Sequence, residues 1–351
     1  MKPVALGVIG CGVIGKVHLQ SASQTPAART VAVADLRVEA AKEAAERFGV
    51  KTVYASGEEL LEDNQVEAVI LAMPTGARRG LAVKALKKGK HVLVEKPIAM
   101  NSREVRQMIA ARGKLVAGCC SSRNRFLPSG EALAKAIASG VLGDIRVVRA
   151  RSIGPAGEKP ETPRPAWRLI RALNGGGILV NWGCYDLDYL LGSCGWTLKP
   201  EVVLAQTWTI PPVFESHVAP GSDAETHYAA IVRCEGGAIL SIERGEYCAA
   251  AHDEAWGIIG TKASLRFQMT PGANKKIILD EGTTDKGVAS KTIWEGSEDW
   301  SIVHNALVHD FALAIRENRQ PKTSLEQALV IQQITDAIYA SARRGTAVRV
   351  R

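Results

Sequence analysis

The sequence predicts an α/β protein of two domains, with residues 1–122 forming a parallel sheet covered by helices and residues 123–351 forming a larger α+β domain. At 351 residues the chain is long for a single hydrophobic core. Apolar runs alternate with helical patterns up to about residue 122, and the composition then changes. All seven tryptophans lie between Trp167 and Trp300, which places them in the second domain.

The first domain is predicted from short apolar runs rich in Val, Ile, Leu and Ala, which are typical of buried strands. Between them lie segments with apolar residues at three- and four-residue spacing, which indicates helices such as 37–48 and 76–88. Strands that alternate with helices imply right-handed crossovers and a parallel sheet covered on both faces. The predicted strands are 4–9, 31–35, 67–72, 90–94 and 114–119.

The second domain mixes helices with longer alternating strands. It begins with a helix near 129–139, a strand near 144–152 and a loop at 153–166 that contains four prolines. A glycine-led helix is predicted at about 178–191. Antiparallel strands follow at 201–210, 225–234, 237–246 and 254–268, and the chain closes with two helices near 303–317 and 324–343, which are free to pack back on the first domain.

Bulk composition excludes several classes of protein. A hydrophobic fraction of 46% with 23% charged residues is typical of a globular protein, and no apolar run is long enough to cross a bilayer. The N-terminus enters the first strand directly, so we expect no signal peptide and a cytoplasmic protein. The seven cysteines include no Cys-x-x-Cys pair, which predicts reduced, packed thiols and no metal site.

The net charge of +8 raises the question of a nucleic-acid partner. Residues 1–122 hold 18 Lys and Arg against 11 Asp and Glu, whereas the remainder is nearly balanced. The basic surplus forms no dense run and no stripe interleaved with aromatic residues. An anionic cofactor on the first domain explains it better than nucleic acid or a membrane surface.

The first strand runs directly into Gly-x-Gly-x-x-Gly at Gly10, Gly12 and Gly15. Gly10 permits the tight turn, Gly12 lets a pyrophosphate approach the backbone, and Gly15 lets the next helix pack closely. The amides at that helix N-terminus, around Val13 and Ile14, then face the phosphates. A glycine turn that binds nothing is the weaker interpretation, because the motif lies between a strand and a helix. It predicts a Rossmann dinucleotide-binding domain.

Asp35 ends the second apolar run, twenty residues after Gly15. A carboxylate there accepts hydrogen bonds from the adenosine ribose hydroxyls and repels a 2′-phosphate, so NAD is favoured. Leu36 adds no phosphate donor. Arg37 leaves NADP as the alternative cofactor.

Two further turns follow predicted strands, Met73-Pro74-Thr75 and Glu95-Lys96-Pro97. Ligands of parallel sheets bind at the carboxyl ends of the strands, so both turns are expected near the cofactor. A lysine at this position lowers the pKa of a reacting hydroxyl and stabilises the developing alkoxide. Glu95 is expected to orient the ammonium or contact the cofactor. Taken alone, a Lys-Pro pair is more often an exposed loop.

A third candidate is the segment from Gly175 to Asp188, in which Asn181, Tyr185 and Asp188 recur at i, i+4 and i+7 and would share one face of a helix. A tyrosine in an apolar segment usually packs, with its hydroxyl bonded to a neighbour. Close to Lys96, its phenol would instead serve as a general acid/base. The residues alone favour packing.

The chain resembles the glucose–fructose oxidoreductase/inositol dehydrogenase (Gfo/Idh/MocA) family over essentially its whole length. The resemblance is carried by GVIGCGVIGKVH, ADL, EKP, Trp167-Arg168 and GGGIL-N-x-G-x-Y-x-x-D. IASGVLGD at 137–144 and AIYASAR near the C-terminus add to it. It implies a nicotinamide-dependent oxidoreductase of sugars or cyclitols. It also implies a second domain built on an open, mainly antiparallel sheet, often buried in a dimer or tetramer.

Carried over by position, the resemblance makes Lys96 the catalytic lysine. Tyr185 stands where inositol dehydrogenases have a catalytic histidine and glucose–fructose-type members a tyrosine. Asn181 replaces an aspartate found in many members, and an amide cannot accept a proton in a relay, although it can hold a hydroxyl. Arg78 replaces a common histidine and bears on cofactor contacts.

Trp167 and Arg168 resemble a pair that reaches toward nicotinamide and substrate in relatives, although a core tryptophan is an equally good interpretation of Trp167. Arg123 and Arg125 follow the last strand of the first domain, and a basic residue before Phe126 favours Arg125 as a substrate contact. His217, His227, His304 and His309 are interpreted as surface or structural residues.

The sequence therefore predicts an NAD-dependent enzyme that moves hydride between nicotinamide and a secondary alcohol or ketone of a sugar, glycoside or cyclitol. One alternative is a tightly held NAD recycled in place, in sugar–sugar transfer or glycoside cleavage through a transient ketone. Another is a non-catalytic protein that senses NAD. A homodimer or homotetramer is expected.

The predicted catalytic residues are Lys96 and Tyr185, and the predicted substrate contacts are Asn181, Arg125, Trp167 and Arg168. The predicted cofactor contacts are Gly10, Gly12, Val13, Ile14, Gly15, Asp35, Leu36, Met73, Pro74, Thr75, Arg78, Glu95 and Lys96.

Overall fold

The computed structural model describes residues 2–351 and divides into two compact units. The first unit contains the chain up to Phe126 together with Trp300–Gln332, and the second contains Leu127–Asp299 and Gln333–Arg351. One sheet lies in each unit, six-stranded and parallel in the first, nine-stranded and mainly antiparallel in the second. The predicted fold class is confirmed.

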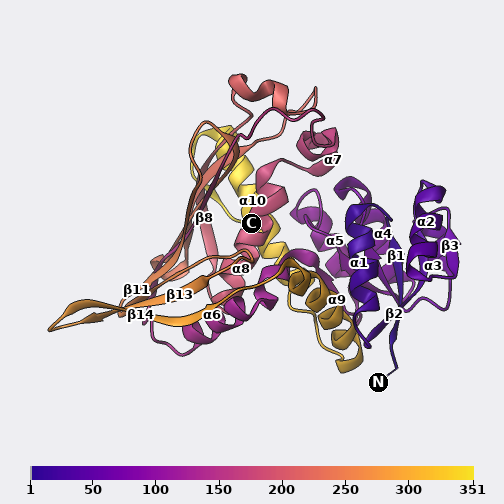
Figure 1. The fold of residues 1–351 in the computed structure, drawn as a ribbon, viewed down its shortest axis with the longest axis horizontal. Helices are drawn as coiled ribbons and strands as arrows, with labels where there is room; N and C mark the ends of the chain where they lie inside the picture. Colours follow the sequence, from indigo (N-terminus) through magenta and orange to yellow (C-terminus); the bar gives the residue numbers. More distant parts are fainter. Residues whose placement is uncertain (1) are drawn as a thin grey trace. The chain divides into compact units, whose positions relative to one another are not determined.

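The sheet of the first unit has the order β3-β2-β1-β4-β5-β6, in which each half of the sheet is built outward from β1. Its strands are β1 (Val4–Ile9), β2 (Ala28–Ala34), β3 (Thr52–Tyr54), β4 (Ala68–Leu71), β5 (His91–Val94) and β6 (Ala117–Cys119). The connecting helices are α1 (Val13–Ser23), α2 (Val38–Phe48), α3 (Gly57–Glu62), α4 (Thr75–Lys87) and α5 (Ser102–Arg112). Figure 1 shows α1 and α2 beside β1 and β2.

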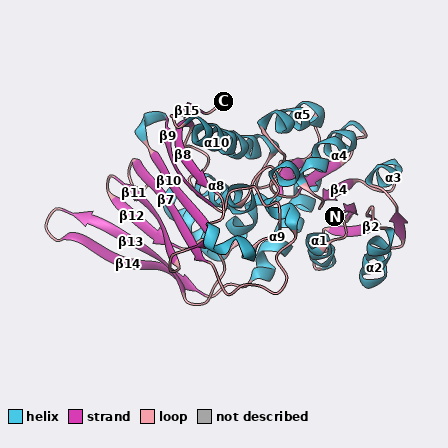
Figure 2. Ribbon diagram, turned by 90° about the horizontal axis from the view of Figure 1, so that it is seen from above, coloured by secondary structure: helices cyan, strands magenta, loops and turns pink. Residues whose placement is uncertain are grey.

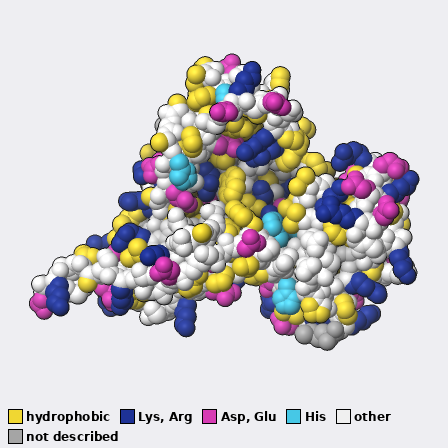
Figure 3. Space-filling view, viewed as in Figure 1, with side chains coloured by type: hydrophobic (Ala, Val, Ile, Leu, Met, Phe, Trp, Pro, Cys, Tyr) yellow, Lys and Arg dark blue, Asp and Glu magenta, His cyan; other side chains and the backbone are white. Residues whose placement is uncertain are grey.

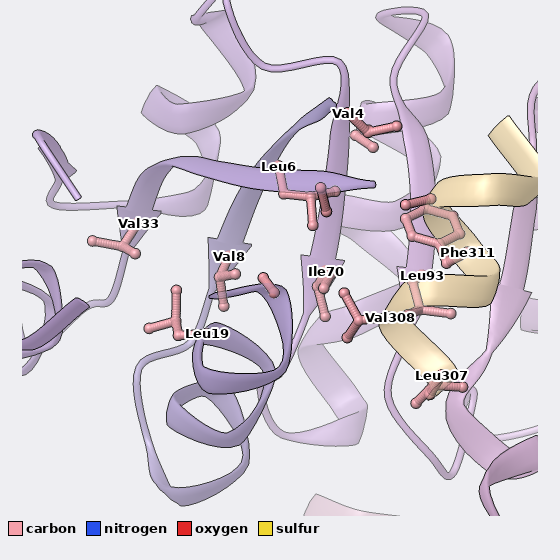
Figure 4. Packing of buried hydrophobic residues seen from close by; sticks show 14 of the residues in the cluster. Val4, Leu6, Val8, Leu19, Val33, Ile70, Leu93, Leu307, Val308 and Phe311 are labelled. Carbon is pink, nitrogen blue, oxygen red and sulfur yellow. The ribbon is translucent and has the colours of Figure 1, made fainter. Parts of the chain in front are cut away.

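Both faces of this sheet are buried, which explains why its strands are apolar throughout. Along β1, Leu6 and Val8 belong to one core cluster and Ile9 to the other. The first cluster is completed by α9 (Trp300–Glu317), whose Phe311 packs close to the strands in Figure 4. Full burial of such a side chain stabilises the fold by about 1.5–3 kcal/mol. A late helix is therefore part of the first hydrophobic core.

The sheet of the second unit has the order β14-β13-β12-β11-β7-β10-β9-β8-β15 (Figure 2). Within the described residues β7 and β10 pair in parallel, and the other pairs are antiparallel. The strands are β7 (Ile145–Pro155), β8 (Pro200–Trp208), β9 (His227–Cys234), β10 (Ile239–Cys248), β11 (Asp253–Gly260), β12 (Ala263–Phe267), β13 (Lys275–Thr283), β14 (Gly287–Gly296) and β15 (Val348–Arg349).

Alternation along these strands separates a buried face from an exposed one. Val203 of β8 pairs with Val232 of β9, and both are fully buried. The next residues along, Leu204 and Ile231, also pair, yet 54% and 45% of their surfaces are exposed. Successive side chains of a strand point to opposite faces, so the outer face carries exposed apolar groups. The helices of this unit are α6 (Pro128–Ala138), α7 (Arg171–Asn174), α8 (Cys184–Ser193) and the end of α10 (Leu325–Arg344).

Several predicted elements were wrong in detail. The run 254–268 is two strands, β11 and β12, joined by a turn at residues 261–262. The predictions named no strand at β3, β13, β14 or β15 and no helix at α3, α5 or α7. β14 is exposed along most of its length, so it carries no apolar alternation to detect. The helix expected from residue 178 begins instead with a π-helical turn at Leu179–Gly183.

The charges of the first unit are dispersed. Figure 3 shows basic and acidic side chains interspersed on the visible face of this unit. Exposed pairs such as Lys84–Glu58 and Lys88–Glu62 account for part of the pattern. Across residues 2–351, no helix has the length and apolar character needed to cross a membrane.

Candidate active site

The glycine loop after β1 is shaped by two close backbone contacts. Gly10 has φ +97°, which favours glycine, and a Cβ there would overlap the carbonyl group of Ala72. A Cβ at Gly15 would overlap the carbonyl oxygen of Gly10. At Gly12, by contrast, a Cβ would meet nothing within 4 Å. The fold itself therefore requires glycine at positions 10 and 15, while the glycine at 12 leaves open space for a ligand.

The helix that follows this loop has features of an anion site. α1 begins at Val13, no side chain caps its N-terminus, and its first turn holds no acidic residue. Val13 and Leu36 are 88% and 83% exposed, although both are apolar. Unsatisfied amides and the helix dipole favour a negatively charged group at this end. These features fit a dinucleotide pyrophosphate.

Asp35 directly follows β2 and is fixed by two backbone amides. Cys11 N–H donates to Oδ2 at 2.8 Å, and Arg37 N–H donates to Oδ1 at 2.8 Å. The carboxylate is thereby held beside the glycine loop. Ribose contact by this carboxylate stays a prediction.

Arg78 donates hydrogen bonds to both turns that are predicted to lie near the cofactor. Its Nε donates to the carbonyl of Met73 at 2.6 Å, and Nη1 donates to the carbonyl of Glu95 at 2.8 Å and to that of Pro97. Because β4 and β5 are adjacent parallel strands, both turns lie at the same edge of the sheet. The guanidinium thus fixes the turn after β4 against the turn after β5, which contains a cis Lys96–Pro97 bond.

Glu95 is the centre of a buried polar cluster. Its Oε1 bonds to His18 Nε2 at 2.8 Å and forms an ion pair with Arg123, while Oε2 accepts the backbone N–H of Lys96 at 2.9 Å. Burial opposes ionisation, but the charge of Arg123 and the His18 hydrogen bond outweigh it and hold the pKa of Glu95 well below its usual range. The carboxylate is therefore ionised and fixes the backbone at Lys96.

The same cluster brings together three potential metal ligands. Ligand atoms of His18, Glu95 and Cys120 lie within 4.8 Å of one another. Burial, and then the charge of Glu95, raise the pKa of the Cys120 thiol well above its usual value. A protonated thiol is a poor metal ligand, and the Arg123 guanidinium already neutralises the carboxylate. This donor set fits a buried ion pair better than a metal.

In the second unit, Glu225 anchors the segment that leads to Tyr185. Its Oε1 accepts N–H groups of Gly177 at 2.9 Å and Leu179 at 3.2 Å, and the Tyr339 hydroxyl at 2.7 Å. A Cβ at Gly177 would overlap the Glu225 backbone, and one at Gly176 would overlap the Tyr339 hydroxyl. The glycine run is therefore needed for close packing around a buried carboxylate.

Asn181 lies in the π-helical turn, so the single regular helix face expected for Asn181, Tyr185 and Asp188 was wrong in detail. π-turns occur frequently at functional sites. The Asn181 amide donates to the carbonyl of Arg168 at 3.3 Å and accepts from Asn174 Nδ2 at 3.4 Å. It thereby connects α8 to the Trp167-Arg168 turn.

Tyr185 is buried, and its neighbours Trp182 and Asp186 are both in contact with Arg244. Its ring makes an edge contact with Trp182 at a centroid distance of 5.7 Å. Asp186 accepts a bidentate pair from Arg244 at 2.6 and 2.7 Å, and the Arg244 guanidinium lies 5.0 Å from the centre of the Trp182 ring. Charge-assisted bidentate pairs fix orientation strongly. α8 is consequently held against β10 on both sides of Tyr185.

The remaining predicted residues differ in exposure. Trp167 is exposed in a short 3₁₀ turn, Ala166–Leu169. Arg125 is buried and donates to the carbonyl of Lys322 at 2.6 Å and to the Thr323 hydroxyl at 2.7 Å. Its bonds hold the segment before α10 within the first unit. Substrate contact by either residue stays a prediction.

Comparison with known proteins agrees with this geometry. Residues 4–117 match an oxidoreductase family with an NAD-binding Rossmann fold, and residues 131–266 match the Gfo/Idh/MocA C-terminal domain. The chain belongs to the Gfo/Idh/MocA oxidoreductase family. The protein is therefore an NAD-dependent oxidoreductase, and the glycine loop lies in its NAD-binding domain.

Relatives cover most of the chain or nearly all of it. The uncharacterized oxidoreductase ORF334 of Rhizobium meliloti is 28% identical over 98% of this chain and 98% of its own. The myo-inositol 2-dehydrogenase of Thermotoga maritima is 27% identical over 74% of each chain. The solved structure of levoglucosan dehydrogenase with NADH and L-sorbose has a TM-score of 0.84, with 22% identity over 100% of both chains, which confirms the fold.

Several residues of this Gfo/Idh/MocA chain were missed by sequence reasoning. The position of His18 could have been recognised from the sequence, since it follows Gly15 by three residues and therefore lies one turn along α1. Glu225 and the Asp186–Arg244 pair could not be recognised from the sequence, because their partners are 46 to 114 residues away along the chain. Only the folded chain brings them together.

Gly12→Ala should weaken NADH binding by at least about tenfold, or 1.4 kcal/mol. The added methyl group meets no protein atom but enters the space expected for the pyrophosphate. Fluorescence titration with NADH measures the Kd, and thermal unfolding should show an unchanged Tm. Gly15→Ala is the contrasting variant, since its methyl group clashes inside the protein and should lower Tm. An unaltered Kd in Gly12→Ala would contradict this role of the loop.

Stability should fall as the pH drops from about 6.5 toward 4. Burial, and then the charge of Arg123, lower the pKa of His304 to about 4. Over this range the unfolded state binds a proton at His304 that the folded state does not, so acidification favours unfolding. His304→Gln should reduce the loss of unfolding free energy between about pH 7 and about pH 5.5, measured by urea titration. The exposed His252→Gln serves as control, and equal slopes in all three proteins would disprove the assignment.

Proposed function

We propose that the protein transfers hydride between NAD and a secondary alcohol or ketone of a sugar, glycoside or cyclitol. The observation that carries this proposal is the buried polar cluster of Glu95, His18 and Arg123, in which Glu95 fixes the backbone of Lys96. Lys96 follows β5, and the glycine loop follows β1 of the same parallel sheet. Carboxyl ends of parallel strands share one edge, so the fixed backbone of Lys96 and the cofactor loop lie at the same edge.

The bound cofactor supplies hydride exchange at its nicotinamide ring. Lys96 stabilises the negative charge that develops on the reacting oxygen, since a preorganised ammonium costs no reorganisation at the moment of reaction. Tyr185 exchanges the hydroxyl proton through its phenol oxygen. The Asp186–Arg244 pair and Trp182 fix the helix that carries this phenol.

Asp35 selects NAD over NADP in this proposal. Two backbone amides fix its carboxylate, where it would accept ribose hydroxyls and repel a 2′-phosphate. Asn181, Arg125, Trp167 and Arg168 are proposed to contact the substrate. Relatives are named for myo-inositol and levoglucosan, which are polyhydroxylated rings and support this substrate class.

Lys96→Ala and Tyr185→Phe should each lower kcat by about 10²–10⁴-fold, because each removes a group that acts on the reacting oxygen. Tyr185→Phe should leave NADH affinity nearly unchanged. A panel of myo-inositol, levoglucosan and L-sorbose with NAD, NADH and the NADP forms would identify a working substrate. Lys87→Ala and Tyr54→Phe are the matched controls. If both active-site variants keep wild-type kcat, the assignment is wrong. Stoichiometric NADH release excludes recycling of a tightly held cofactor.

We further propose a homodimer or homotetramer that covers the outer face of the nine-stranded sheet. Leu204 and Ile231 are adjacent on that face and exposed. Contiguous exposed apolar groups commonly mark association surfaces.

Sedimentation velocity should give at least a dimer mass for the wild type and a monomer mass for Leu204→Lys/Ile231→Lys, since two buried ammonium groups oppose association. Val288→Lys, at an exposed position of β14, is the control. A monomeric wild type would refute this interface.

A further inference from the structure

A pocket lies wholly within the second unit and is lined by residues from three separate segments. Arg164 and Arg168 come from the segment after β7, Ser222 from the loop before β9, and Glu246 and Tyr247 from the end of β10. Two arginines, a glutamate, a serine and a tyrosine thus line one depression. A small number of polar groups in a concave, partly apolar site is typical of small-molecule binding.

The backbone at the end of β10 is irregular, and this irregularity lets two consecutive side chains line the pocket. In a regular strand, consecutive side chains point to opposite faces. Glu246 and Tyr247 are consecutive, yet both line the pocket. Tyr247 has φ 56°, which is uncommon for a residue other than glycine, and the register with β7 shifts between Gly245 and Cys248. Such irregularities re-aim side chains and concentrate at ligand sites.

Glu246 is a largely buried carboxylate of this pocket with one long hydrogen bond, from Arg164. Its side chain is only 17% exposed, and its ion pair with Arg164 is long, at 3.5 Å, to a guanidinium that is itself 60% exposed. Glu225 of the same unit, by contrast, accepts three hydrogen bonds between 2.7 and 3.2 Å. Burial raises the pKa of Glu246, although Arg168 and Arg164 oppose the shift. A ligand that donates hydrogen bonds would satisfy this carboxylate.

The charges of the pocket define the chemistry of that ligand. Ionised Glu246 only accepts hydrogen bonds, and Arg164 and Arg168 only donate them. A neutral pair of adjacent hydroxyls suits both, because each hydroxyl donates to a carboxylate and accepts from a guanidinium.

The pocket adjoins the segment that carries Tyr185. The Arg168 carbonyl accepts the Asn181 amide at 3.3 Å. Arg244, two residues before Glu246 on β10, holds Asp186 next to Tyr185. A ligand at Glu246 is therefore bound by the same framework that orients Tyr185.

We propose that Glu246, together with Arg164 and Arg168, forms a subsite for a neutral vicinal diol of the substrate and determines specificity for it. This inference rests on the proposed sugar or cyclitol activity and assigns part of its recognition. Glu246 binds a portion of the substrate away from the reacting carbon, so its contribution is to substrate affinity rather than to the chemical step.

The test compares Glu246→Gln with Glu243→Gln, which changes a carboxylate on the same strand that is 36% exposed and bonded to His227. With the best compound of the three-member panel, Glu246→Gln should raise KM by about tenfold or more and leave kcat within about threefold, the pattern of a lost binding contact. NADH affinity should not change in either variant, and Glu243→Gln should match the wild type. An unchanged KM in Glu246→Gln would overturn the proposal.

A second measurement separates this inference from the proposed function. Binding of myo-inositol, levoglucosan and L-sorbose to the NADH-loaded protein is measured by ligand-observed NMR. Binding without turnover that Glu246→Gln weakens would refute the proposed activity and uphold the subsite. Binding that both variants preserve equally, or no binding of any of the three, overturns the subsite.

Discussion

The carboxylate of Glu95 connects parts of the first unit that are far apart in the sequence. Through His18 it reaches α1, through Arg123 it reaches the 3₁₀ segment after β6, and through its own side chain it fixes the amide of Lys96. Removal of one partner from a buried ion pair typically costs about 3–5 kcal/mol, because a charge is left uncompensated. The helix behind the glycine loop and the turn that carries Lys96 therefore depend on one buried group.

The parts of the fold that could be predicted are those with local causes. The glycine loop, the alternation of strands and helices, and Asp35 are all encoded within short segments. β14 could not be predicted, because its side chains are mostly exposed and its pairing with β13 is set by the hairpin rather than by a pattern. The π-turn at Leu179–Gly183 was also unpredictable, since the glycines before it pack against Glu225 and Tyr339, which are distant along the chain.

The candidate site divides in the same way. Lys96 and Tyr185 could be named from motifs, and their catalytic roles stay predictions. Glu225, Arg244 and Glu246 could not, because each acts through residues from distant segments. Arg78 and Arg125 illustrate a further limit, since a sequence shows that an arginine is present but not that its guanidinium is already bonded to carbonyl groups.

Asn181 gains a physical explanation from its neighbours. Its amide donates to the carbonyl of Arg168 while its oxygen accepts from Asn174. An aspartate at this position would place an acceptor against the Arg168 carbonyl, so an amide suits this position. The Asn181 amide cannot accept a proton, but it connects its segment to the Trp167-Arg168 turn. In the proposed mechanism, proton exchange is therefore left to Tyr185.

The π-turn also has a consequence for how the family can vary. It accommodates one residue more than an α-helical turn between the Glu225 anchor and Tyr185. Loss of that residue would rotate every later side chain of α8 by about 100° around the helix axis. The direction of the Tyr185 phenol is thus set by chain length as well as by residue type. A single-residue deletion here would redirect the phenol without changing the type of any residue in α8.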